Sequence, residues 1–152
     1  MTPFERITTQ VQAQIPLVRA MEAALGKPEA HRLIRDALDR ANREIVGARG
    51  SLLDIPTLAA EFAGFGKGIR YEFETLEQTD TVLRNQVNHC DYAEFMEQIG
   101  ARDLGELLIC NSDFAMADEL GLKLERSKTC MNGDGSCDFC YKVKSKQQSR
   151  ST

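Results

Sequence analysis

The chain has 152 residues, 42% of them hydrophobic and 28% charged, with a formal net charge of −4 at pH 7. That length suits one domain with a hydrophobic core, which we place at residues 1–144, followed by a disordered tail at residues 145–152. The acidic balance argues against a nucleic-acid-binding protein, whose phosphate-binding face needs clustered Lys and Arg. Apolar runs stay short of the ~20 residues that cross a bilayer, and no signal-peptide pattern is visible, so we expect a cytoplasmic protein without membrane contacts.

Apolar residues at helical spacing predict two long helices at the N-terminus. The first covers residues 3–25, and Pro16 is expected to kink or split it. The second begins near Pro28 and continues to Ile45 as an amphipathic stripe. A third, short helix follows Asp54, whose carboxylate suits an N-cap position. Exposed apolar faces on the N-terminal helices would be compatible with a homodimer.

The pattern changes to a period of two at Ile69, which predicts a half-buried strand followed by a more polar strand at residues 81–89. Helices are then expected at residues 91–99 and, as one continuous element, at residues 102–120. A final hairpin of residues 122–131 and 137–144 surrounds a Gly-Asp-Gly turn. The order predicts an α+β fold: N-terminal helices followed by an antiparallel sheet of about four strands with helices packed on one face.

Four of the five cysteines lie in settings from which they could reach one pocket. Cys110 and Asp113 are three residues apart on an expected helix and so point the same way. Asp113 falls within an apolar stripe, where a charge needs a partner. The alternative for this pair is a buried thiol beside a solvent-facing carboxylate. Cys90 follows His89, but neighbours on a strand face opposite ways, so a Cys-His nucleophilic pair would require the strand to end there.

Cys130, Cys137 and Cys140 suggest a structural zinc site. However, Cys137 and Cys140 are three apart on an expected strand and therefore face opposite ways, which disfavours zinc. Cys137 is in phase with Phe139 and is expected to face the core or a pocket within it. Asp134, in the turn, has a plain alternative role as a cap of its own loop.

Four motifs follow one another in the C-terminal half of the chain: Cys90-Asp91-Tyr92-Ala93, Cys110-Asn111-Ser112-Asp113, Arg126-Ser127-Lys128-Thr129 and Gly133-Asp134-Gly135-Ser136-Cys137-Asp138-Phe139. In this order they resemble the L-2-amino-thiazoline-4-carboxylic acid hydrolase family. The similarity covers roughly residues 90–143, while the N-terminal half agrees in layout only. Cys130 and Cys140 depart from the family pattern, in which an apolar residue and an arginine are expected.

The resemblance implies a hydrolase that opens a small cyclic amidine, such as L-2-amino-thiazoline-4-carboxylate, to N-carbamoyl-L-cysteine. Arg126 would then pair with the substrate carboxylate. Asp113 or Asp134 would bind the amidinium and activate water, and Cys110 or Cys137 would attack covalently if a cation lowers the thiol pKa. Water attack and covalent attack both stay open. The remaining substrate contacts are assigned to Thr129, Cys90 and Tyr92.

The family is also distantly similar to the 4-vinyl reductase type of ligand-binding domain, in which some members hold zinc through Glu-x-x-Cys and a later Cys. The alternative function is therefore a non-catalytic small-molecule-binding or sensing domain, with zinc bound through cysteines as a variant. Aligned on Cys137, the first two zinc ligands become Arg126 and Thr129. A cation in place of a ligand favours a small organic anion over zinc, so we expect no cofactor.

Overall fold

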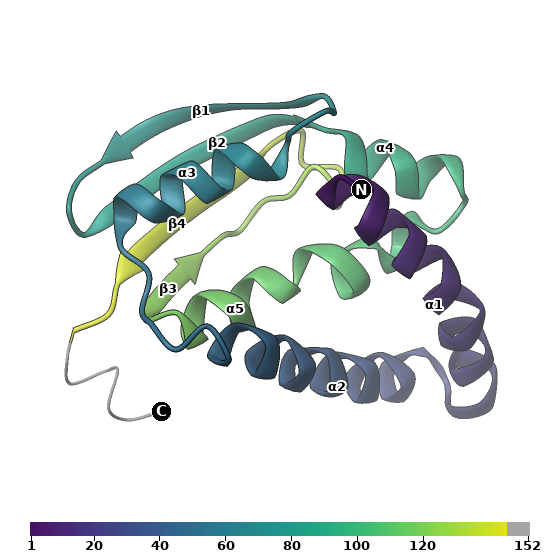
Figure 1. Ribbon diagram of the computed structural model, residues 1–152. Helices are drawn as coiled ribbons and strands as arrows, with labels where there is room; N and C mark the ends of the chain where they lie inside the picture. Colours follow the sequence, from purple (N-terminus) through teal and green to yellow (C-terminus); the bar gives the residue numbers. More distant parts are fainter. Residues whose placement is uncertain (146–152) are drawn as a thin grey trace.

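Residues 1–145 are described by a computed structural model, in which helices and strands follow the predicted α+β order (Figure 1). The elements are α1 (Pro3–Leu25), α2 (Lys27–Gly47), α3 (Ile55–Phe65), β1 (Tyr71–Gln78), β2 (Val82–Cys90), α4 (Asp91–Gln98), a 3-10 turn η1 (Arg102–Leu104), a π-helical turn η2 (Glu106–Cys110), α5 (Ser112–Glu119), β3 (Leu122–Glu125) and β4 (Cys137–Val143).

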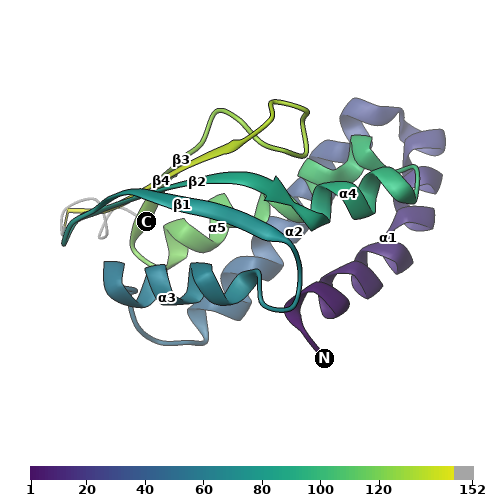
Figure 2. The same ribbon diagram turned by 90° about the horizontal axis from the view of Figure 1, so that it is seen from above.

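Within these residues the strands form one antiparallel sheet of four in the order β1-β2-β4-β3. Helices α3 and α5 lie on one side of it, with α2 beyond α5, as Figures 1 and 2 show. The opposite face is not covered by helices and carries a shallow groove of about 400 Å³. Arg84 and Gln86 line this groove, and both lie on β2, the strand that was predicted to be the more polar one.

The long N-terminal helices form where the sequence predicted them, and α1 is capped at both ends. Thr2 and Glu5 make a capping box at the start of α1, with Thr2 Oγ1 accepting from Glu5 N at 3.1 Å. Gly26, at φ 81°, ends α1, and α2 begins at the next residue. Pro16 does not split the helix, which is continuous over 23 residues.

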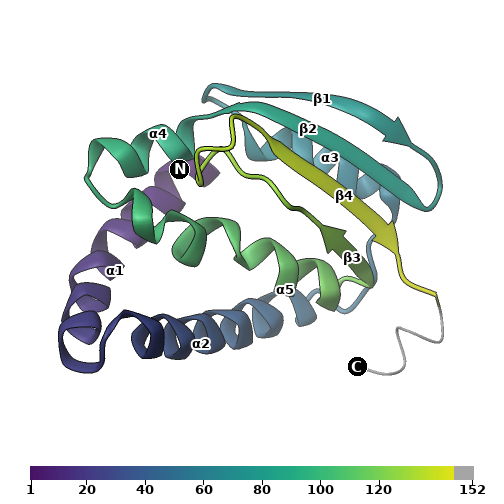
Figure 3. The same ribbon diagram turned by 180° about the vertical axis from the view of Figure 1, so that it is seen from behind.

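The predicted continuous helix at residues 102–120 is wrong, because the chain breaks there into η1, η2 and α5. In η2 the Asn111 amide donates to Glu106 O at 2.8 Å, five residues back, which inserts a residue into the helical turn. Such π turns occur often at functional sites. The last hairpin is also shorter than predicted, because β3 ends at Glu125 and residues 126–136 form a loop (Figure 3).

The hydrophobic core consists of two clusters. One lies between the sheet and α3, and the other joins α1, α4 and the η1–η2 turns. Cys90 and Cys130 pack against both clusters, so the thiols lie where the two meet. In residues 1–145 no helix has the length and apolar character needed to span a bilayer. The expected tail lies outside the described residues except for Ser145.

Candidate active site

A cavity of about 310 Å³ lies between the sheet and the helices, near the lower end of the roughly 300–1,000 Å³ of small-molecule sites. The sheet side is formed by β2, β4 and the loop after β3, and η2 and α5 form the floor. Helices α1 and α2 close the remaining side. The volume suits a small ligand that contains one ring or a few fused rings.

Seven of the eight side chains expected at the site line this cavity. Asp134 does not: it is exposed, and its Oδ2 accepts from Thr129 N at 3.1 Å while its own amide donates to Thr129 O. Asp134 therefore caps its own loop, which is the alternative role that the sequence analysis gave for it. The seven are Cys90, Tyr92, Cys110, Asp113, Arg126, Thr129 and Cys137.

Arg126 and Asp113 form an ion pair inside the cavity, with Nη1 2.8 Å from Asp113 Oδ2. The Arg126 side chain is only 3% exposed. Its second nitrogen donates to Cys110 O at 3.0 Å, and its guanidinium carbon lies 4.9 Å from the Phe114 ring centroid and 5.0 Å from that of Phe139. Aromatic faces on both sides suit a planar cation. Arg126 is thus fixed by the protein itself.

Burial raises the pKa of Asp113, and the Arg126 charge works against that effect. The carboxylate is nevertheless accessible from the cavity, since 28% of its side chain is exposed. A carboxylate with a raised pKa in a cleft is a stronger proton acceptor than a free one. Asp113 therefore has the position and the chemistry of a general base.

Burial raises the pKa of all three thiols that line the cavity. Burial raises the pKa of Cys90 to about 11 and that of Cys137 to about 12. Burial also raises the pKa of Cys110 well above its ordinary value; Asp113 adds to the increase, and Arg126 only partly offsets it. The condition set for a covalent route, a thiol pKa lowered by a cation, is therefore not met by Arg126.

Two hydroxyl groups at the cavity differ in their hydrogen bonding. Thr129 Oγ1 donates to Glu106 Oε1 at 2.9 Å and accepts from Asn132 N at 3.0 Å, so it fixes the loop. Tyr92 is 1% exposed, and its hydroxyl has no hydrogen-bond partner within residues 1–145. An unsatisfied buried polar group costs about 1–3 kcal/mol. A ligand or water that reaches this hydroxyl would recover that cost.

The helical side of the cavity was missed by the sequence analysis. Arg6, Gln10 and Gln14 recur every four residues on α1 and all line the cavity, as do Arg35 and Asn42 of α2. The signal was present as a polar row beside the apolar stripe of each helix. Polar rows on helices usually face solvent, so the spacing alone did not identify them as site residues.

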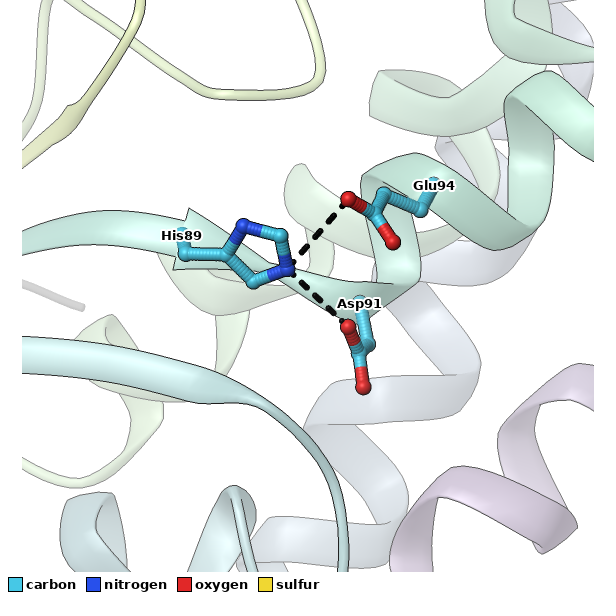
Figure 4. Close-up of side chains that lie close together, drawn as sticks. All are labelled: His89, Asp91 and Glu94. Atoms are coloured by element: carbon cyan, nitrogen blue, oxygen red, sulfur yellow. Dashed lines mark hydrogen bonds and ion pairs between the residues drawn. The ribbon is translucent and has the colours of Figure 1, made fainter.

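A separate cluster lies at the junction of β2 and α4, where His89 Nε2 is 3.0 Å from Asp91 Oδ1 and 3.4 Å from Glu94 Oε1 (Figure 4). These three ligand atoms lie within 4.8 Å of one another, so the group could hold a cation. Asp91 Oδ2, however, accepts from Arg70 N at 2.7 Å. Both carboxylates occupy the first turn of α4, whose positive end already stabilises them. We therefore interpret this cluster as a structural feature that stabilises the junction between β2 and α4.

The cysteines do not gather at metal-ligand spacing. Among residues 1–145 no group of three or more His, Cys, Asp or Glu side chains with ligand atoms within 4.8 Å includes a cysteine. All five cysteines are free, and Cys137 and Cys140 lie on opposite faces of β4, with Cys137 at the cavity and Cys140 at the outer groove. This arrangement agrees with the strand phase predicted from the sequence.

The loop after β3 is held in place by Asp138, which projects from β4 on the outer face. Its carboxylate accepts from Ser127 N at 2.8 Å, Ser127 Oγ at 2.6 Å and Lys128 N at 2.7 Å. Burial alone would raise the pKa of Asp138, but these hydrogen bonds outweigh burial and hold it below its ordinary value. Because Arg126 directly precedes Ser127 in the chain, these hydrogen bonds of Asp138 also position Arg126.

The family model of L-2-amino-thiazoline-4-carboxylic acid hydrolase matches residues 5–141, which span both the helical side of the cavity and the motifs of the C-terminal half. The chain belongs to this family. The family match therefore covers the N-terminal helices of the chain as well as residues 90–143, where the motifs had indicated the resemblance. No curated protein and no solved structure matches the chain.

Proposed function

We propose that this member of the family hydrolyses a small cyclic amidine such as L-2-amino-thiazoline-4-carboxylate to N-carbamoyl-L-cysteine. The observation that carries the proposal is the Asp113 carboxylate, which lines the cavity and is held in one orientation by a buried Arg126. A fixed carboxylate can both bind an amidinium and accept a proton from water. Family membership supports the reaction class.

In the proposed reaction, water attacks the amidine carbon while Asp113 accepts its proton. The tetrahedral intermediate then collapses by breaking the bond between this carbon and the ring sulfur. The hydroxyl oxygen of the intermediate forms the new C=O bond and its proton is released to solvent. The sulfur leaves as a thiolate and takes up the proton from Asp113, so that the amidinium and one water give a ureido group, a thiol and a proton. Arg126 keeps the carboxylate aimed at the reacting carbon throughout, which is the advantage of a preorganised charge.

Direct attack by water is favoured over attack by a cysteine because the thiol pKa values are raised. With values of about 11 for Cys90 and about 12 for Cys137, only a small fraction would be thiolate at neutral pH. Cys110, whose pKa is also raised, lies beside Asp113 and would add bulk and a weak hydrogen-bond donor to the site.

The test is incubation of the purified protein with L-2-amino-thiazoline-4-carboxylate, followed by mass spectrometry of the small molecules and of the intact protein. We expect N-carbamoyl-L-cysteine to form and no adduct to accumulate. Asp113→Asn should lower kcat by on the order of 100-fold or more, because the general base is lost while the shape is kept. Asp80→Asn, a change of the same kind on an exposed turn, should keep the wild-type rate.

Variants of the thiols and of the second carboxylate separate the routes. Cys110→Ser and Cys137→Ser should retain turnover. If either thiol attacked the substrate covalently, its replacement would instead abolish turnover, and the wild-type protein would show a trapped adduct. Asp134→Asn should also retain turnover because Asp134 lies outside the cavity. Ligand-induced stabilisation without any product would instead support the binding or sensing function.

A further inference from the structure

The cavity has a second polar end, formed by Tyr92 and Arg6. The Tyr92 ring is fixed by Phe65, stacked at 4.8 Å, and by the edge of Phe4 at 5.0 Å. Its hydroxyl is buried and unpartnered within residues 1–145, and Tyr92 lines the cavity. A rigid, unsatisfied donor in the wall of a cavity is suited to a ligand oxygen.

Arg6 lines the same cavity from the first turns of α1. Arg6 is exposed, and among residues 1–145 its side chain takes part in no ion pair or side-chain hydrogen bond. Burial raises the pKa of Tyr92 and Cys90 adds to this, whereas the positive charge of Arg6 opposes it. Arg6 is therefore an unpaired cation on the cavity that Tyr92 also lines.

Arg126 is not free in this way. Asp113 neutralises it, Cys110 O accepts from it, and two aromatic rings cover its faces. Three arginines and two aspartates line the cavity, the others being Arg35 and Asp39 on α2. With Arg126 and Asp113 paired, the remaining charge at the helical end is positive, since two arginines face one aspartate.

We propose that Arg6, with the Tyr92 hydroxyl as a second donor, binds the carboxylate of the ligand and selects carboxylate-bearing rings over neutral ones. The inference deepens the proposed function, on which the identity of the ligand rests. The amidine end of the ligand lies at Asp113 and its carboxylate end at Arg6 and Tyr92.

The test compares two probes, L-2-amino-thiazoline-4-carboxylate and 2-amino-2-thiazoline, which is the same ring without the carboxylate. For the wild-type protein and for Arg6→Gln and Tyr92→Phe, kcat/KM is measured with each probe. Arg6→Gln should lower kcat/KM for the carboxylate on the order of 10- to 100-fold, and Tyr92→Phe roughly 3- to 10-fold. Neither should change kcat/KM for the neutral ring. Arg40→Gln, which removes an exposed charge of α2 outside the cavity, is the matched control.

Equal losses for both probes in Arg6→Gln would overturn the proposal, because they would mean a general effect on the cavity. A second readout, the shift in Tm on adding each probe, separates this proposal from the hydrolase proposal. Stabilisation by the carboxylate in the wild type, absent in Arg6→Gln, supports the subsite even if no product forms. A wild-type protein that the carboxylate does not stabilise more than the neutral ring overturns the subsite, whatever the turnover.

Discussion

At the scale of single residues, the pair of Arg126 and Asp113 decides what the cavity can do. A guanidinium that is 3% exposed needs a counter-charge, and Asp113 provides it at 2.8 Å. The carboxylate in turn remains partly exposed to the cavity. The pair is buried on the arginine side and accessible on the aspartate side. The protein thus keeps a negative charge in the cavity without leaving it unpaired.

The raised pKa of Asp113 predicts a pH dependence. Because turnover needs the carboxylate, kcat/KM should fall on the acid side with a midpoint above the ordinary Asp pKa of 3.8. Arg126→Gln removes the charge that opposes burial, so it should move this midpoint to higher pH, whereas Arg126→Lys should keep it closer to the wild type. A pH profile of kcat/KM measures both. An unchanged midpoint in Arg126→Gln would show that another group limits the rate.

The raised pKa of Asp113 has the opposite pH dependence for folding stability: turnover is lost in acid, whereas this contribution to stability is present in acid. A carboxyl group whose pKa is raised by folding stabilises the folded state at pH values below the unfolded pKa, and this contribution is lost as pH rises through the folded pKa. Asp138 behaves in the reverse manner, because its pKa is lowered. Its contribution is present above the unfolded pKa and is lost in acid, so the loop that carries Arg126 should loosen at low pH.

At the scale of elements, two close approaches shape the cavity. Gly105 lies under the side chain of Met131, next to the π turn η2 that carries Cys110. Gly66 ends α3 and lies against Tyr71, which lines the cavity. In both places a glycine lets an element approach its neighbour more closely than a side chain would permit.

The contact at Gly66 gives a matched pair of variants. A Cβ on Gly66 would lie 2.6 Å from Tyr71 Cβ, which cannot move without the strand, so Gly66→Ala should destabilise the protein by about 1–3 kcal/mol. Gly64 is helical with nothing within 4 Å, so Gly64→Ala should be neutral or stabilising by up to ~1 kcal/mol. Urea unfolding measures both. Equal stabilities would show that Tyr71 is free to shift.

At the scale of the whole molecule, α1 and α2 act chiefly as a cover for the cavity. Of the 21 residues of α2 only Ala30 is fully buried, and Leu17, Leu25 and Leu33 on the two helices are exposed. The homodimer suggested by the sequence stays a prediction. Sedimentation of the wild type and of Leu17→Lys tests it, since Leu17 is 67% exposed in the single chain.

The assignment of the His89 cluster predicts the result of metal removal. Because its groups satisfy one another and Arg70 N, dialysis against EDTA should change neither Tm nor turnover. Metal analysis of the protein before and after dialysis is the accompanying measurement. A fall in Tm that zinc or another divalent ion restores would assign the cluster to a cation, and His89→Ala should then abolish the restoration.

Local patterns in the sequence predicted the order of the elements and most of the candidate residues on the sheet side of the cavity. Helical periodicity, caps at Thr2 and Asp54 and the period-two pattern are local properties, so they persist in the folded chain. The phase of β4 correctly placed Cys137 on the inner face and Cys140 on the outer face. Together with the family motifs, these patterns named eight candidate residues, seven of which line one cavity.

The tertiary structure brings together polar groups that no local pattern connects. Residues 102–120 were predicted as one helix, yet close packing of Met131 on Gly105 accompanies a π turn that no local pattern marks. Asp134 folds back on Thr129 and lies outside the cavity. Arg6 lies more than eighty residues from Tyr92 in sequence, so their place on one cavity depends on how α1 packs against α4 and η2. Local propensity sets elements, whereas long-range packing sets the chemistry of a site.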